Sequence, residues 1–247
     1  MLRYPLYTDG ATKRRWIRLP SGVAVDRTDP DEWRFPPGTR LFKELSRDGR
    51  LIETRMLEFR GPDEGDWLMV AYVWDQEGSD ASLAVDGAEN ALGTAHDVPA
   101  ARDCHACHDG RRNRVLGYSA VQLGELVPPG TDADRAALGY LHANCSHCHN
   151  AVRPTPLAGA ARCFNPQNPL DFRILAADTS EVTSTAAYRT AVVATQDLRP
   201  GNPAGSHAIA LMRGQGFGGE RMPPLGTEQL DTEGIATIET WVRSLRP

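Results

Sequence analysis

The sequence has no long hydrophobic run and no excess of positive charge. Its 247 residues include 27 Lys and Arg against 32 Asp and Glu, which gives a formal net charge of −5 at pH 7. Its apolar stretches fall well short of the roughly 20 consecutive apolar residues that span a bilayer. The sequence therefore predicts no transmembrane segment. The acidic balance also argues against a nucleic-acid partner, because phosphate binding requires a basic surface.

Cysteines are few, yet four of the five fall in two copies of one pattern. Cys104-His105-Ala106-Cys107-His108 and Cys145-Ser146-His147-Cys148-His149 both have the form Cys-x-x-Cys-His. Two thiols at this spacing form thioethers with the vinyl groups of haem, and the adjacent histidine ligates the iron. The sequence thus predicts two covalently bound haem c groups. The attaching cysteines are Cys104, Cys107, Cys145 and Cys148, and the proximal iron ligands are His108 and His149.

Zinc is the competing cofactor, because two Cys-x-x-Cys pairs also supply four thiolates. The first cysteines of the two pairs are 41 positions apart, which is longer than the usual zinc-ribbon spacing. A zinc ribbon also has no need of a histidine directly after each pair. Haem is therefore preferred. The remaining thiol, Cys163, is expected to be a small buried apolar side chain.

The sixth iron ligand of the second haem is predicted to be Met222. It lies in the Pro-rich segment Arg221-Met222-Pro223-Pro224-Leu225-Gly226, 73 residues after His149 and just before a C-terminal amphipathic stretch. In single-domain cytochromes c the axial methionine comes from such a late Pro-rich loop. The alternatives are Met212 as the ligand, or a Met222 that only fills a gap in the core.

The first haem has no comparable loop, because only 36 residues separate His108 from the second motif. His96, 12 residues before His108, has enough tether to reach the opposite face of the haem and is the candidate sixth ligand. The alternatives are a hydrogen-bonded His96 with no ligand role and a five-coordinate iron. Four other side chains are rival ligands: His142, His207, Met56 and Met69.

Two kinds of sequence pattern divide the chain near residue 95. Between residues 14 and 85, short β-type runs such as Trp67–Trp74 alternate with Gly- and Pro-rich turns, which indicates an N-terminal all-β, sandwich-like domain over residues 1–95. Later, Thr131 to Asp134 has the form of a helix start. An apolar stripe at Ile235, Ile238, Trp241, Val242 and Leu245 predicts a final amphipathic helix. The expected fold class is α+β, with a mainly α-helical, cytochrome c-like dihaem domain over residues 96–247.

Haem attachment takes place outside the cytoplasm, which predicts a periplasmic or extracellular location. Residues 1–6 lack the apolar core and cleavage site of a secretory signal. We therefore expect that a leader or an upstream anchor has been removed before residue 1.

Several segments together resemble a bacterial family of exported haem proteins that join a β-domain to a cytochrome c-like part. The resemblance covers most of the chain and implies two c-type haems and export. Its segments are Phe35-Pro36-Pro37-Gly38-Thr39, Glu53-Thr54-Arg55, Ala71-Tyr72-Val73-Trp74, residues 98–108, Tyr140-Leu141-His142-Ala143-Asn144-Cys145 and Arg221-Met222-Pro223-Pro224-Leu225-Gly226.

The expected function is single-electron transfer by a dihaem c-type cytochrome between other redox proteins, an electron donor and an electron acceptor. One alternative is a dihaem peroxidase-like enzyme in which the first haem has an open site. Another is a haem subunit that docks to a larger redox complex through its β-domain. The basic segment Arg111-Arg112-Asn113-Arg114 is either a docking patch or a solvated loop.

Overall fold

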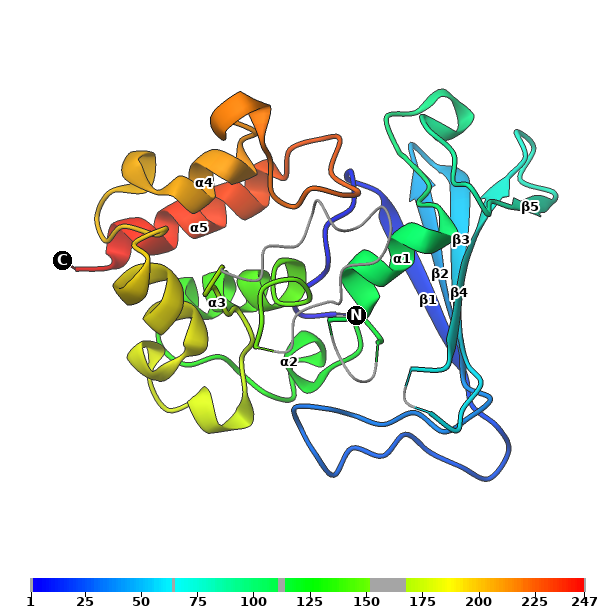
Figure 1. Ribbon diagram of the computed structural model, residues 1–247, viewed down its shortest axis with the longest axis horizontal. Helices are drawn as coiled ribbons and strands as arrows, with labels where there is room; N and C mark the ends of the chain where they lie inside the picture. Colours follow the sequence, from blue (N-terminus) through cyan, green and yellow to red (C-terminus); the bar gives the residue numbers. More distant parts are fainter. Residues whose placement is uncertain (1, 64, 111–113, 152–167, 247) are drawn as a thin grey trace. The chain divides into compact units, whose positions relative to one another are not determined.

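Strands fill the first part of the chain and helices the remainder, so the fold is α+β as expected (Figure 1). The structure is a computed structural model that describes residues 2–63, 65–110, 114–151 and 168–246. Its backbone divides into two compact units. The sheet unit contains the described residues of 8–115. The helical unit contains those of 2–7, 116–151 and 168–246.

The sheet unit is built on five antiparallel strands in the order β1-β2-β3-β4-β5. The strands are β1 (Thr12–Arg18), β2 (Arg40–Arg47), β3 (Arg50–Phe59), β4 (Trp67–Trp74) and β5 (Ala81–Leu83). Each strand pairs with the next along the chain; a two-residue turn joins β2 to β3, whereas residues 19–39 separate β1 from β2. The predicted β-rich region is confirmed, but its described residues form one sheet, not the two layers of a sandwich.

The first helix, rather than a second sheet, packs on one face of this sheet. Helix α1 (Ala101–His108) contacts β4 and lies along the face that carries Arg55 and Ala71 (Figure 1). We call this the inner face and the opposite one the outer face. A short helical turn (Ala91–Gly93) precedes α1, and the buried side chains of Ile52, Ala71, Ala91 and Val98 form a small core beside it.

Local hydrogen bonds attach α1 to the sheet unit. The N–H of Ala101 donates to the carbonyl of Val85 at 2.9 Å, and Ala88 pairs with Val98 in an antiparallel bridge. The boundary between the units consequently falls after Val115, about 20 residues later than the sequence pattern suggested. The first Cys-x-x-Cys-His motif thus belongs to the sheet unit, and the second belongs to the helical unit.

Helices α3 (Asp132–Asn144) and α5 (Thr232–Ser244) pack against each other in the helical unit (Figure 1). Short helices accompany them: α2 (Ala120–Leu123), α4 (His207–Met212), the π-helical segment Tyr188–Ala194, and turns at Ala176–Asp178, Val182–Ser184, Pro203–Gly205 and Phe217–Gly219. In the described ranges no helix combines the length and the apolar character that crossing a membrane requires.

Both helix predictions for this unit are confirmed. The Thr131 side chain accepts a hydrogen bond from the N–H of Asp134, whose carboxylate accepts one from the N–H of Thr131, so the two form a capping box. The apolar stripe of α5 is buried at Ile235, Ile238, Trp241 and Val242. The Trp241 indole N–H donates to Asp134 Oδ1 at 2.8 Å and so joins α5 to the first turn of α3.

Candidate haem-attachment sites

Helix α1 presents both thiols of the first motif from one side. Cys104 and Cys107 are three positions apart, which places them on the same helical face. The helix ends at His108, where the Nδ1 atom donates a hydrogen bond to the carbonyl oxygen of Arg114 at 2.5 Å. A carbonyl only accepts, so this contact fixes the tautomer whose Nε2 carries the lone pair for a metal. The residues present therefore fit a histidine-ligated haem iron.

Burial and nearby charged groups have opposing effects on the Cys104 thiol. Burial raises the pKa of the Cys104 thiol to about 11, while the nearby Arg55 guanidinium acts in the opposite direction. The residue between the two cysteines, His105, contacts Asp109 through Nδ1 at 3.1 Å, and Asp109 also pairs with Arg114. His105 thus has a side-chain partner within the sheet unit.

His96 lies in a buried cluster of charged groups in the sheet unit. Its Nε2 atom is 2.8 Å from Oε1 of Glu53, and its Nδ1 atom is 3.7 Å from Oδ2 of Asp9. Glu53 also forms an ion pair with Arg55. Burial would raise the pKa of Glu53, but Arg55 and His96 together lower it to about 2. The sixth-ligand role of His96 stays a prediction, and it would require Nε2 to leave Glu53 or Nδ1 to turn from Asp9.

The structure separates the rival ligands of the first haem. Met69 is buried and lies on the inner face, two positions from Ala71, whereas Met56 alternates with Arg55 and points to the outer face. His142 and His207 belong to the helical unit. His142 Nδ1 accepts a hydrogen bond from the N–H of Ile174, and His207 Nδ1 lies 3.1 Å from Asp197. Met69 is therefore the rival that shares a face with α1.

The second motif forms a tight turn directly after α3. The N–H groups of Cys148 and His149 both donate to the carbonyl of Cys145, at 3.1 and 2.9 Å. The His149 ring packs edge-on against Phe172, with 5.5 Å between ring centroids. Cys145 packs against the core of the helical unit, and burial raises the pKa of its thiol to about 12. This turn holds the second pair of thiols and its histidine at the end of a buried helix.

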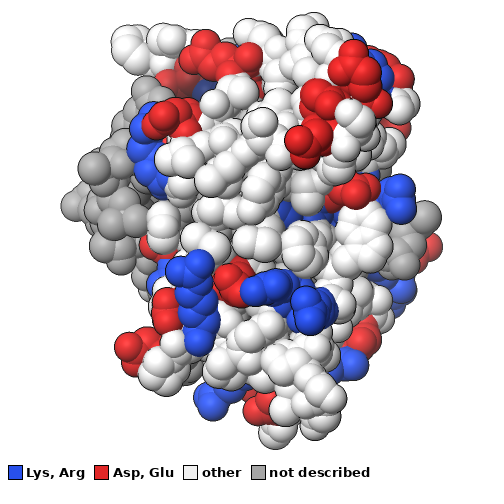
Figure 2. Space-filling view, turned by 90° about the vertical axis from the view of Figure 1, so that its right-hand side faces the viewer, with Lys and Arg blue, Asp and Glu red and all other residues white. Residues whose placement is uncertain are grey.

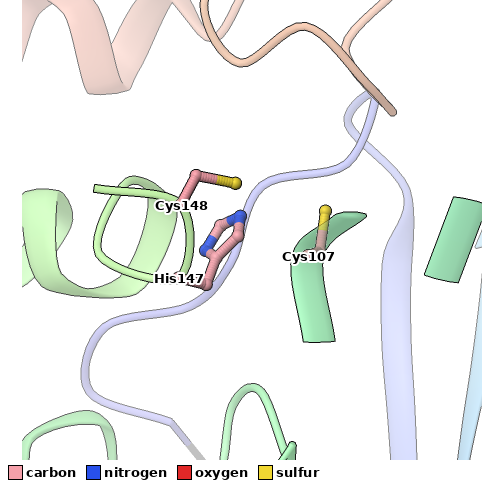
Figure 3. A group of neighbouring side chains, drawn as sticks. All are labelled: Cys107, His147 and Cys148. Atoms are coloured by element: carbon pink, nitrogen blue, oxygen red, sulfur yellow. The ribbon is translucent and has the colours of Figure 1, made fainter. Parts of the chain in front are cut away.

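Figure 3 shows Cys107 on α1 and, on the turn after α3, His147 and Cys148. The first residue belongs to the sheet unit and the other two to the helical unit. A zinc site made of the four motif thiolates would need cysteines from both units. Each unit, by contrast, carries one complete Cys-x-x-Cys-His motif.

A small pocket in the helical unit joins the end of α3 to the Pro-rich loop. Tyr140 and Asn144 of α3 line it, together with Met222 and Met212. The Tyr140 ring lies so close to Gly234 of α5 that any side chain there would clash with it. The pocket thus brings both methionine candidates to the helix that carries the second motif, and Met222 as the ligand stays a prediction.

No site role was predicted for three charged residues of the inner face, Lys43, Glu53 and Arg55, although Glu53 and Arg55 lie in a segment that carries the family resemblance. Each sits in an ordinary β-type run, where charged residues normally alternate outward, so only the strand register reveals that they share the inner face. Cys163 and residues 111–113 of the basic segment lie outside the described residues.

Comparisons with known proteins returned no match: no family model, no curated protein and no solved structure matches this chain. The resemblance to exported haem proteins accordingly stays a prediction.

Proposed function

We propose that this protein is a dihaem c-type cytochrome that transfers single electrons between redox partners outside the cytoplasm. The observation that carries the proposal is the local structure of the two Cys-x-x-Cys-His motifs. Each motif lies at the C-terminal end of a helix, α1 or α3. In the first, the hydrogen bond to Arg114 orients the ring of His108 with Nε2 as the metal-binding nitrogen.

Each unit contributes two cysteines that attach a haem and one histidine that ligates its iron. Cys104 and Cys107 attach one haem and His108 ligates it, while Cys145, Cys148 and His149 serve the other. Haem iron supplies the one-electron redox couple, and its axial ligands set the potential. Met222 lines the pocket at the end of α3, which supports it as the sixth ligand of the second haem.

Haem content tests the proposal directly. The chain is expressed in a host with the haem-attachment machinery and a secretory leader, then extracted with acidified acetone. We expect two haems per chain to stay with the protein, because thioether links are covalent. Recovery of stoichiometric zinc, or of a colourless protein without bound haem, contradicts the proposal.

A second candidate function, a peroxidase-like enzyme, is favoured by the cluster beside the first motif. The Glu53 carboxylate, the His96 imidazole and the Arg55 guanidinium lie together, and Arg55 and Glu53 both act on the Cys104 thiol. Such groups can move a proton and stabilise developing negative charge at a reacting oxygen.

Ligand binding and peroxide turnover separate the two functions. A carrier with both irons six-coordinate binds carbon monoxide and cyanide slowly and does not turn over peroxide. Fast ligand binding at one ferrous haem, with peroxide turnover that is lost in Glu53→Gln, supports the enzyme. We expect the carrier result.

A further inference from the structure

Three cationic side chains stand directly opposite one another across the inner face of the sheet. Arg15 of β1 pairs with Lys43 of β2, and Lys43 pairs with Arg55 of β3. Side chains at paired positions have Cβ atoms about 5 Å apart, and like charges in such pairs destabilise a sheet. A row of this kind therefore needs anionic groups to balance it.

The described residues balance only one end of this row. Glu53 is the one acidic side chain that strands β1–β4 place on the inner face, and it pairs with Arg55. Within the described parts of the chain, neither Lys43 nor Arg15 forms an ion pair. Burial and the positive charges of Arg55, Arg15 and Lys13 together lower the pKa of the half-buried Lys43 to about 7, against the opposing effect of Glu53. The cations around Lys43 thus outweigh the one nearby carboxylate.

On the outer face of the same sheet two of the three cations have an ion-pair partner, while the third, Arg18, stands opposite Arg40. Arg40 forms an ion pair with Glu58 at 2.7 Å, and Arg14 lies 3.8 Å from Glu44. Figure 2, which looks onto the side of the molecule at the right of Figure 1, shows basic and acidic side chains next to one another. The excess of positive charge is therefore larger on the face on which α1 packs, where strands β1–β4 place Lys13, Arg15, Lys43 and Arg55 against the single carboxylate of Glu53.

The row leads away from the thiols of the first motif. Arg55 lies close enough to Cys104 and Cys107 for their charges to act on its pKa. Neighbouring strands are about 4.8 Å apart, so Lys43 lies about 5 Å and Arg15 about 10 Å beyond Arg55 across the sheet. Exposure increases in the same direction, because Ala71 is buried, Lys43 is half-buried and Arg15 is exposed.

We propose that Lys43 and Arg15 bind the two propionates of the haem attached to Cys104 and Cys107. The inference rests on the proposed function, because it requires haem at the first motif. Haem carries its vinyl groups and its propionates on opposite edges of the macrocycle. A haem tethered next to Arg55 has its carboxylates on the edge away from the thiols, in the direction of Lys43 and Arg15. Two carboxylates balance these two cations, and charge-assisted hydrogen bonds of this type are strong. Arg55 is left out of the assignment because it already forms an ion pair with Glu53.

Reduction potentials of the haem-loaded protein test the assignment. Lys43→Met and Arg15→Gln are compared with Arg14→Gln, a control that removes a cation next to Arg15 in the chain but on the outer face. Removing a cation near the haem favours the ferric state, which carries more positive charge. We expect each inner-face variant to lower the potential of one haem, with about a tenfold change in its ratio of oxidised to reduced protein, or about 59 mV. The control should leave both potentials unchanged.

The conservative variant Lys43→Arg separates charge from other roles of this side chain. A guanidinium pairs with a carboxylate but does not ligate iron, so Lys43→Arg should keep the wild-type potentials. A shift in Lys43→Arg equal to that in Lys43→Met overturns the assignment. Because Arg15 is exposed, Arg15→Gln provides the same test if Lys43→Met does not fold.

Failure of the inference is distinguishable from failure of the proposed function. Wild-type protein without two covalent haems contradicts the function, and the inference falls with it. Haem-loaded Lys43→Met and Arg15→Gln proteins with unchanged potentials overturn the inference alone. Equal shifts in Arg14→Gln and Arg15→Gln also overturn it, because the effect would then be one of overall charge.

Discussion

The Nε2 atom of His96 lies 2.8 Å from Oε1 of Glu53, and both side chains are fully buried. The residues are 43 positions apart in sequence, and Arg55 pairs with the same carboxylate. Removing one partner of a buried ion pair leaves an uncompensated charge. The stability of the sheet unit should therefore depend strongly on Glu53.

Replacing Glu53 should destabilise the sheet unit. In Glu53→Gln the Arg55 guanidinium loses its partner, and we expect a loss of about 3–5 kcal/mol in the free energy of unfolding. Denaturant unfolding followed by circular dichroism measures it. The control is Glu44→Gln, which breaks an exposed pair worth about 0–1 kcal/mol. Equal losses in both variants would refute a special role for the buried pair.

The same carboxylate predicts a dependence of stability on pH. The pKa of Glu53 is about 2 in the folded protein, below the unfolded value of about 4.3. Its contribution is thus fully present above about pH 4.3 and is lost as the pH falls toward 2. Thermal midpoints measured between pH 6 and 2 should converge for the wild type and Glu53→Gln at the acid end. A constant gap between the two proteins would disprove this.

Replacing His96 tests its predicted role as a haem ligand. If His96 is the sixth ligand, His96→Gln converts one haem to a high-spin signal in low-temperature electron paramagnetic resonance. Unchanged signals of both haems, with a loss of stability only, would contradict the ligand role and leave His96 as the partner of Glu53. Met69→Leu then serves as the comparison, since Met69 is buried on the inner face.

The pocket lined by Met222 and Met212 leads to a prediction about the reduction potentials of the haems. Met222→His should lower the potential of one haem and leave the other nearly unchanged, because a thioether ligand favours ferrous iron more than imidazole does. Met212 lines the same pocket, so Met212→Leu is the matched control. If Met212→Leu shifts a potential and Met222→His does not, the ligand is Met212.

Loss of the second attachment site should affect the helical unit selectively. Cys145 packs against the core of that unit, and we expect Cys145→Ala with Cys148→Ala to leave one haem per chain and to lower the thermal midpoint. The paired variant Cys104→Ala with Cys107→Ala should instead remove the haem of the sheet unit. Two haems in either double variant would contradict the attachment sites.

Features that depend on local spacing can be read from the sequence alone. The two Cys-x-x-Cys-His motifs, the capping box at Thr131 and the apolar stripe ending at Val242 all lie within a few helical turns, so side-chain chemistry and helical periodicity suffice to find them. The β-rich character of the first part of the chain is also a local feature, because short β-type runs alternate there with turn residues.

Which distant residues share a surface depends on tertiary packing. One sheet with a helix on its inner face, instead of a sandwich, follows from how α1 packs on β4. The contact of His96 with Glu53 and the opposition of Lys43 to Arg15 and Arg55 depend on strand register and chain reversal. A register shift of one residue would turn each of these charges to the other face, and no local pattern in the sequence specifies that register.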